Sequence, residues 1–226
     1  MNQRTDRFLF WIRLLAVAAV VVSCVLLYEY VRLAAGLSGK SFCNISQTIN
    51  CDAVSQSKWA RILGFPLAGY GLGFYLAVFF LALLSASGRF LERRSAGNVL
   101  LLLSIFSVVF SLYLFFISAF AVQSFCILCA CLYVINILFF LCALGLEGDG
   151  GLFVRMAQGR RALWRFAALC SGSAGEGGDR LLARAGLAAL LILSCLVFSL
   201  PDMILVKLVL PALHSEQNHR MSGVVL

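Results

Sequence analysis

Apolar segments of membrane-spanning length alternate with shorter polar segments along this chain. A helix needs about 20 apolar residues to cross the hydrocarbon core of a bilayer. Apolar runs of that size cover residues 8–31, 66–84, 99–122 and 124–144, and a fifth, 185–208, is interrupted by Pro201. The pattern predicts an all-α integral membrane protein, with residues 1–226 forming a single membrane domain.

The first apolar run has two readings, a cleaved signal peptide or a membrane anchor. Arg4 and Arg7 precede it, and small residues follow at Ala34, Ala35 and Gly36, as a signal peptide requires. However, the apolar core of a signal peptide is only about 7–15 residues long. The length of this run therefore favours an uncleaved anchor.

Composition agrees with a membrane protein and argues against a nucleic-acid binder. The chain is 62% hydrophobic and 12% charged, whereas soluble domains are about half apolar and a quarter charged. Its net charge is +8, but the basic residues lie in short runs between the apolar segments. That distribution is typical of residues that set orientation in a bilayer. We therefore expect no nucleic-acid partner.

The distribution of Lys and Arg also predicts the orientation. If five helices alternate, one side receives twelve of the 18 basic residues: Arg4, Arg7, Arg13, Arg89, Arg93, Arg94, Arg155, Arg160, Arg161, Arg165, Arg180 and Arg184. The positive-inside rule places this side, with the N-terminus and the loop 145–183, in the cytoplasm. The polar loop 36–65 then lies outside, in the periplasm if the membrane is a bacterial inner membrane, where disulfides persist.

Two cysteines lie in that outer loop, Cys43 and Cys51. The residues between them are small and polar, so a flexible disulfide suited to thiol exchange is one interpretation. A structural staple for a loop without its own core is the other, and the spacing does not separate them. Further along the loop, apolar residues at helical spacing predict a short surface helix over 55–63.

A Cys-x-x-Cys pair, Cys126 and Cys129, opens the fourth apolar run. Near a helix N-terminus the macrodipole favours thiolates, and residues three apart share one face. Four interpretations of this pair remain open: a redox pair, a structural disulfide, half of a metal site, or a chance occurrence. Tyr133 and Asn136 continue the stripe of Cys129, which indicates either a site where a membrane quinone approaches or hydrogen bonding between helices. The other five cysteines are interpreted as small apolar residues or inert thiols.

Together these residues resemble the vitamin K epoxide reductase family in its bacterial form. The matching pieces are Cys43-Asn-Ile-Ser-Gln-Thr-Ile-Asn-Cys51, Ser57-Lys-Trp-Ala-Arg61 with Gly64 beyond it, Cys126-Ile-Leu-Cys129 and Tyr133-Val-Ile-Asn136. Their order, spacing and placement agree with the family over about 8–144. The resemblance implies a four-helix bundle around a quinone, with the fifth transmembrane helix that bacterial members also carry.

The resemblance implies an electron relay through four catalytic cysteines. A reduced secreted protein attacks a Cys43–Cys51 disulfide, and Cys51 then exchanges with Cys126. Cys129 faces the quinone, ubiquinone or menaquinone, while Ser57, Tyr133 and Asn136 line its pocket. Many bacterial members continue into a thioredoxin-like domain. Because this chain ends at Leu226, we expect a separate periplasmic thioredoxin-fold (DsbA-like) partner.

One departure from the family concerns the substrate. Leu67 occupies a position where the vertebrate enzymes have an Asn that hydrogen-bonds the quinone, so simple quinone reduction is favoured over epoxide reduction. The predicted function is thus quinone-linked disulfide formation by an enzyme in contact with membrane lipid. A membrane thiolate protein that binds or transports a metal is the alternative, although no His or carboxylate cluster completes a metal path. A scaffold with purely structural disulfides is the third.

Overall fold

The structure is a computed structural model that describes residues 3–36, 43–46, 48–62, 64–87, 93–146 and 150–171. The predicted fifth span at 185–208 lies outside these residues, as does the end of the predicted loop 145–183. The statements below concern the described part of the chain.

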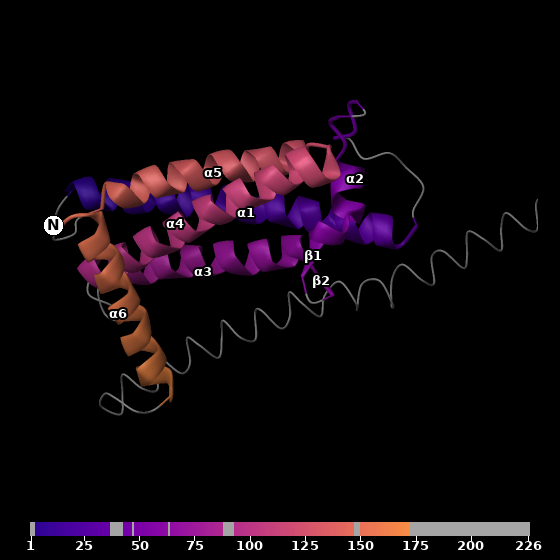
Figure 1. Cartoon of the computed structure of the whole chain (residues 1–226). Coiled ribbons are helices and arrows are strands. Elements are labelled where there is room, and N and C mark those ends of the chain that lie inside the picture. The colour runs from indigo at the N-terminus through magenta and orange to yellow at the C-terminus, as the bar shows by residue number, and fades with distance from the viewer. Residues whose placement is uncertain are drawn as a thin grey trace, which may run out of the picture.

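Four long helices lie side by side along one axis (Figure 1). They are α1 (Gln3–Ala34), α3 (Leu67–Ser87), α4 (Arg93–Phe116) and α5 (Ile127–Leu144), and α4 continues as the π-helical turn η2 (Ile117–Val122). Each is long and apolar enough to cross a membrane. The all-α membrane fold is thereby confirmed. The four helices fall on the first four predicted spans, although α1 extends beyond the predicted 8–31 at both ends.

The helices form a solid apolar core in the half of the bundle that contains the N-terminus. Ile12 of α1, Val78 of α3, Leu100 of α4 and Phe139 of α5 are buried there and belong to one cluster. Large apolar side chains such as Leu112 point outward instead. Outward apolar side chains suit a bundle whose solvent is lipid, because the hydrocarbon core accepts them without cost.

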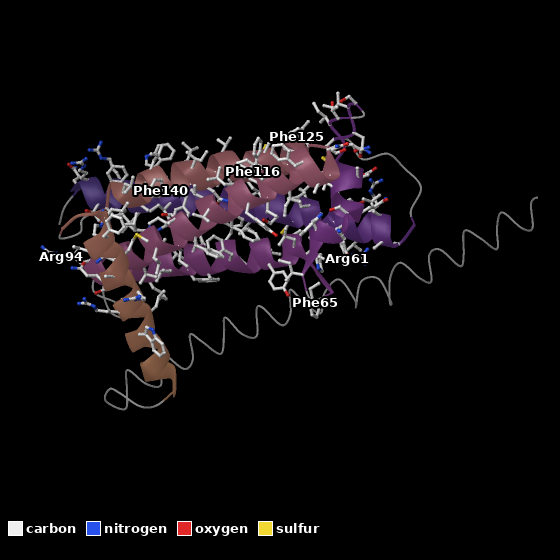
Figure 2. All side chains as sticks on the ribbon, viewed as in Figure 1. Arg61, Phe65, Arg94, Phe116, Phe125 and Phe140 are labelled. Carbon is white, nitrogen blue, oxygen red and sulfur yellow. A yellow bond between two sulfur atoms is a disulfide. The ribbon has the colours of Figure 1, made fainter. Side chains whose placement is uncertain are left out.

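A small cap covers the other end of the bundle. It comprises α2 (Cys51–Gln56), the 3₁₀ turn η1 (Lys58–Ala60) and two short antiparallel strands, β1 (Arg61–Ile62) and β2 (Phe65–Pro66). Arg61 and Phe65 lie at this end in Figure 2.

The surface helix predicted over 55–63 is wrong. Asn50 caps the helix by accepting a hydrogen bond from the backbone N–H of Ala53, so α2 begins at Cys51. Ser57 has extended backbone dihedrals and ends α2. The helix therefore starts four residues earlier than its apolar spacing indicated.

A further helix, α6 (Leu152–Ser171), crosses the opposite end of the bundle (Figure 1). Arg155 is buried against the bundle and donates hydrogen bonds to the carbonyls of Leu144 and Ala143 at the C-terminus of α5. Gly159 packs so closely on α4 that a Cβ would lie 2.5 Å from the carbonyl oxygen of Asn98. The loop predicted at 145–183 therefore contains a helix that is docked through specific contacts.

Candidate active site

The two loop cysteines form a disulfide that is buried in the cap. Cys43 and Cys51 are bonded, and each is only 2% exposed. Backbone hydrogen bonds tie the loop to the start of α5: Phe125 donates to Thr48, at 2.8 Å, and Asn50 donates to the carbonyl of Phe125, at 3.0 Å. The loop is therefore less free to swing than its small polar residues indicated. These bonds also place Asn50, the residue before Cys51, against Phe125, the residue before Cys126.

Cys126 lies at the N-cap of α5, where its sulfur accepts a hydrogen bond from the backbone N–H of Cys129 at 3.4 Å. The thiol of Cys129 and the backbone N–H groups of Cys129 and Leu128 lower the pKa of Cys126, while burial acts in the opposite direction. The prediction of a helix-terminal thiol that favours its thiolate is confirmed for this cysteine. Its thiolate is the form that attacks disulfides.

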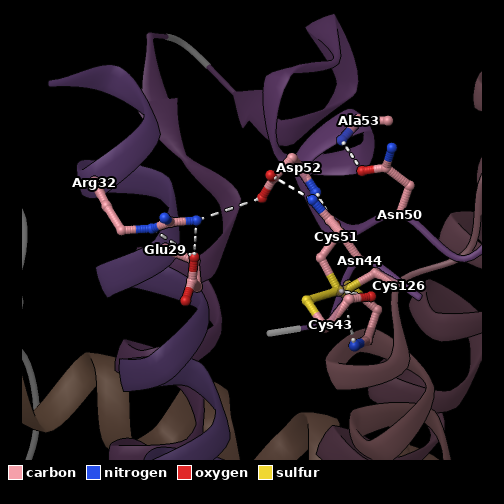
Figure 3. Close-up of a disulfide and its surroundings, with 10 residues drawn as sticks. Glu29, Arg32, Cys43, Asn44, Asn50, Cys51, Asp52, Ala53 and Cys126 are labelled. Atoms are coloured by element: carbon pink, nitrogen blue, oxygen red, sulfur yellow. Dashed lines mark hydrogen bonds and ion pairs between the residues drawn. A yellow bond between two sulfur atoms is a disulfide. The ribbon is translucent and has the colours of Figure 1, made fainter. Parts of the chain in front are cut away.

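The sulfur atoms are arranged in sequence from the cap into the bundle. Cys43, Cys51 and Cys126 belong to one buried cluster, against which Cys129 packs. Figure 3 shows the side chain of Cys126 directed at the disulfide. Cys129, one helical turn further along α5, lies on the wall of a partly open cavity between the helices. Thiol exchange between the disulfide and Cys126 therefore needs little movement of the backbone.

The cavity lies between the four long helices and the cap, and its volume is about 510 Å³. Its walls are mainly apolar, with aromatic side chains from all four long helices and the cap, including Phe74, Phe106, Phe110 and Trp59. Small-molecule sites in proteins have similar volumes and linings. Walls of this kind suit a flat apolar ring system, and Cys129 lies among them.

All three residues predicted to line a quinone pocket lie on this cavity. Ser57 ends α2, and its hydroxyl donates to the carbonyl of Val54 at 2.8 Å. Tyr133 packs edge-on against Phe115, with ring centroids 6.4 Å apart. Leu67, where the vertebrate enzymes have an Asn, also lines it. The structure thus brings the predicted residues together, while their contacts with a ligand stay a prediction.

Asn136 belongs to a hydrogen-bonded chain between helices, one of the two interpretations that the sequence left open for its stripe, although its partners were not predicted. The hydroxyl of Tyr75 donates to its Oδ1 at 3.0 Å, and its Nδ2 donates to the hydroxyl of Ser111 at 2.8 Å. All three side chains line the cavity. One signal was present in the sequence: Ser104, Ser107 and Ser111 repeat at helical spacing along an apolar span. A polar stripe of this kind indicates a face turned toward the bundle interior.

The remaining described cysteines lie elsewhere. Cys24 and Cys131 are exposed on the outer faces of their helices, and Cys142 is partly buried near the opposite end. Within the described ranges, no group of three or more His, Cys, Asp or Glu side chains could hold a metal ion. Cys170 and Cys195 have no described side chains. The chemistry of the described region is therefore concentrated in four cysteines and one cavity.

Comparisons with known proteins agree with this site. The model of the vitamin K epoxide reductase family matches residues 10–144, which include the four long helices, the cap and all four cysteines. The chain is 31% identical to vitamin K epoxide reductase complex subunit 1 of Rattus norvegicus over 133 residues, and equally identical to that of Mus musculus over 134. Each alignment covers 54% of this chain and 80% of the relative. The chain is a multi-pass membrane thiol oxidoreductase and belongs to the vitamin K epoxide reductase family.

Proposed function

We propose that this protein is a quinone-dependent thiol–disulfide oxidoreductase that reoxidises a separate thioredoxin-fold partner in the bacterial periplasm. The observation that carries the proposal is the order of the sulfur atoms, from the capped disulfide through Cys126 to Cys129 on the cavity wall. That order connects a protein thiol outside the bundle to an oxidant inside it. The excess of basic residues at the N-terminal side supports the periplasmic placement of the cap.

Two thiol exchanges would bring the electrons to the cavity. A thiolate of the partner attacks Cys43, its second thiol resolves the mixed disulfide, and both loop cysteines become thiols. Cys51 then attacks Cys126 of a Cys126–Cys129 disulfide, which releases Cys129. Attack of Cys43 on Cys51 restores the loop disulfide and leaves Cys126 and Cys129 reduced.

The cavity would hold the final electron acceptor. Proteins of this family use quinones, and a bound quinone supplies an acceptor for two electrons and two protons. On the protein side, Cys129 presents a thiol at the cavity wall, and Tyr133 presents a hydroxyl that can donate to a carbonyl oxygen. Ser57 adds a second hydroxyl to the wall, which would have to turn away from the carbonyl of Val54 to donate to a ligand. The apolar walls exclude water from the exchange. The thiol of Cys126 lies behind Cys129, ready to re-form their disulfide.

The direct test is quinone reduction by the purified protein in detergent. With a reduced thioredoxin-fold donor, we expect loss of quinone absorbance with a ubiquinone or menaquinone analogue. Cys129→Ala should reduce turnover at least ~100-fold, since it removes the thiol at the cavity, as expected for a reacting group that acts as part of a unit. Cys131→Ala is the matched control: the same substitution, two residues away on an exposed face, should leave turnover unchanged.

A second variant tests the order of the relay. Cys43→Ala should abolish turnover with the protein donor but retain part of it with dithiothreitol, because a small dithiol can reach the inner cysteines directly. Absence of turnover with either quinone, in folded protein with its loop disulfide formed, would contradict the proposed enzyme. A metal bound stoichiometrically by the reduced protein would then favour the metal-binding alternative.

A further inference from the structure

The residues that follow the two loop cysteines are bonded to each other. Nδ2 of Asn44 donates to a carboxylate oxygen of Asp52, and the backbone N–H of Asp52 donates to Oδ1 of Asn44 at 3.3 Å. These two hydrogen bonds connect the same two segments as the Cys43–Cys51 disulfide, one residue further along each. Unlike the disulfide, they contain no sulfur, and reduction does not break them.

The pair is also connected to the bundle through Arg32 of α1. The guanidinium of Arg32 binds Glu29, with Nε 2.9 Å and Nη2 2.7 Å from Oε2. The same Nη2 lies 3.7 Å from Oδ1 of Asp52 (Figure 3). Glu29 is 6% exposed, so this charge pair lies at the inner side of the cap. Asp52 is therefore linked to a helix that is packed into the bundle along its length.

We propose that Asn44 and Asp52, linked to α1 by Arg32, form a clasp that keeps Cys43 near Cys51, and Cys51 beside Cys126, while the loop disulfide is open. Asn44 and Asp52 are positioning residues, because they act through the cysteines. The role of the clasp in the exchange with Cys126 rests on the proposed function, whereas its effect on the loop disulfide does not.

The physical basis is effective concentration. Two thiols held close together re-form their disulfide more readily than two thiols on free segments, because less chain entropy is lost on closure. Coupling is reciprocal: if the closed disulfide favours the clasp, the clasp favours the closed disulfide to the same extent. The clasp should therefore stabilise the loop disulfide against reduction and limit how far Cys51 moves from Cys126.

The first experiment measures the loop disulfide alone. In a Cys126→Ala/Cys129→Ala background, the protein is equilibrated with reduced and oxidised dithiothreitol, which donates two electrons and two protons to the disulfide. Alkylation and mass spectrometry of the peptide containing Cys43 and Cys51 give the oxidised fraction. Since each hydrogen bond contributes a net factor of about 2–10 to an equilibrium, Asp52→Ala should lower the equilibrium constant for disulfide formation about tenfold.

Two further variants make this result specific. Ser46→Ala removes side-chain hydrogen bonds to Thr48 and the backbone of Ile49 within the same loop, and it should change the constant less than about twofold. The exchange variant Asn44→Asp/Asp52→Asn restores both a donor and an acceptor to the pair and should recover most of the loss. Equal effects of Asp52→Ala and Ser46→Ala, or an exchange variant no better than Asp52→Ala, would overturn the clasp.

The second experiment tests the approach of Cys51 to Cys126. In a Cys43→Ala/Cys129→Ala background, oxidised glutathione accepts two electrons from Cys51 and Cys126 as they bond to each other. Adding Asp52→Ala should slow the trapping several-fold, and adding Ser46→Ala should not. Trapping at an unchanged rate in both would overturn this part of the proposal. Neither experiment contains quinone or partner protein, so a negative quinone assay would reject the proposed function without affecting these results.

Discussion

A buried or nearly buried arginine lies at each end of the bundle, and the two are stabilised in different ways. At the cap, Arg32 contacts two carboxylates, Glu29 and Asp52. At the opposite end, Arg155 donates to neutral acceptors, the side chain of Asn98 and the last carbonyls of α5, each at 3.3 Å. One charge is balanced by opposite charges and the other by the negative end of a helix dipole.

The way in which each arginine is stabilised corresponds to the element that it attaches to the bundle. Arg155 fixes α6 on two helices that pack along their length, and burial lowers its pKa from the ordinary value. Arg32 joins α1 to a short helix that begins at Cys51 of the loop disulfide, and its distance to Asp52 exceeds that of a hydrogen bond. Carboxylates retain attraction over such distances, whereas a hydrogen bond weakens steeply with distance and angle. A charge pair therefore suits an attachment that has to persist through small shifts of α2.

The largest effect on stability is expected at Arg32. Arg32→Met leaves the buried carboxylate of Glu29 without its cation, which costs about 3 kcal/mol in comparable sites. For a chain of this size that corresponds to a decrease of roughly 6–12 °C in the thermal midpoint, measured in detergent. Arg7→Met, on an exposed position of the same helix, is the control. Glu29→Gln/Arg32→Met should recover part of the loss, and an unchanged midpoint in Arg32→Met would show that the pair has no structural role.

A smaller effect is expected at Arg155. Arg155→Met leaves two carbonyls of α5 without these donors, but such C-terminal carbonyls can find water at a membrane surface. We expect a loss of about 2 kcal/mol and a midpoint lower by roughly 4–8 °C. Arg160→Met changes an exposed residue of the same helix and should have little effect. If the two variants behave alike, the neutral acceptors do not secure α6.

The contact beneath α6 offers a narrower test. In Gly159→Ala the new methyl group would meet the carbonyl oxygen of Asn98 at 2.5 Å, so the helix has to shift. We expect a loss of about 1–2 kcal/mol, although alanine favours helices. Gly151→Ala is the matched control, because nothing lies within 4 Å of its Cβ position. Equal thermal midpoints for the two variants would contradict the close packing of α6 on α4.

The smallest expected effect concerns the pH dependence of Cys126. Because the thiol of Cys129 and two backbone N–H groups lower the pKa of Cys126, alkylation of Cys126 should persist to lower pH than that of an ordinary thiol. In Cys129→Ala one of these contributions is lost, so the midpoint of the alkylation profile should move upward, while the backbone groups keep part of the shift. Mass spectrometry of the Cys126 peptide across pH gives both profiles. A downward movement of the midpoint in Cys129→Ala would show that the thiol of Cys129 does not lower the pKa of Cys126.

The long helices could be predicted from the sequence because each depends on a run of apolar residues, and length alone identifies a membrane span. The cap could not. The start of its α-helix, α2, is set by a single side chain, Asn50, which caps α2 ahead of the apolar spacing that predicted 55–63. Local capping outweighs a weak amphipathic pattern in so short an element. For the same reason, nothing in the sequence indicated the paired strands β1 and β2.

The candidate active site likewise has a part that could be predicted from the sequence and a part that could not. The positions of Cys126, Cys129 and Tyr133 on one helix follow from helical periodicity, and the structure places them as that periodicity requires. Contacts between distant segments do not follow from any local pattern. Tyr75 meets Asn136 across 61 positions of the chain, and Arg155 meets Asn98 across 57. Such pairs depend on how the helices pack, which a single sequence does not specify.

The apolar core beyond the cavity has a consequence for bioenergetics. The half of the bundle that contains Ile12, Leu100 and Phe139 is filled by packed apolar side chains, which conduct protons poorly. In the proposed reaction, the protons released by the thiols and those taken up on quinone reduction are therefore exchanged at the cap side. Turnover would then carry no net charge across the bilayer. It would conserve no energy as a membrane potential, and a potential of either sign would leave its rate unchanged.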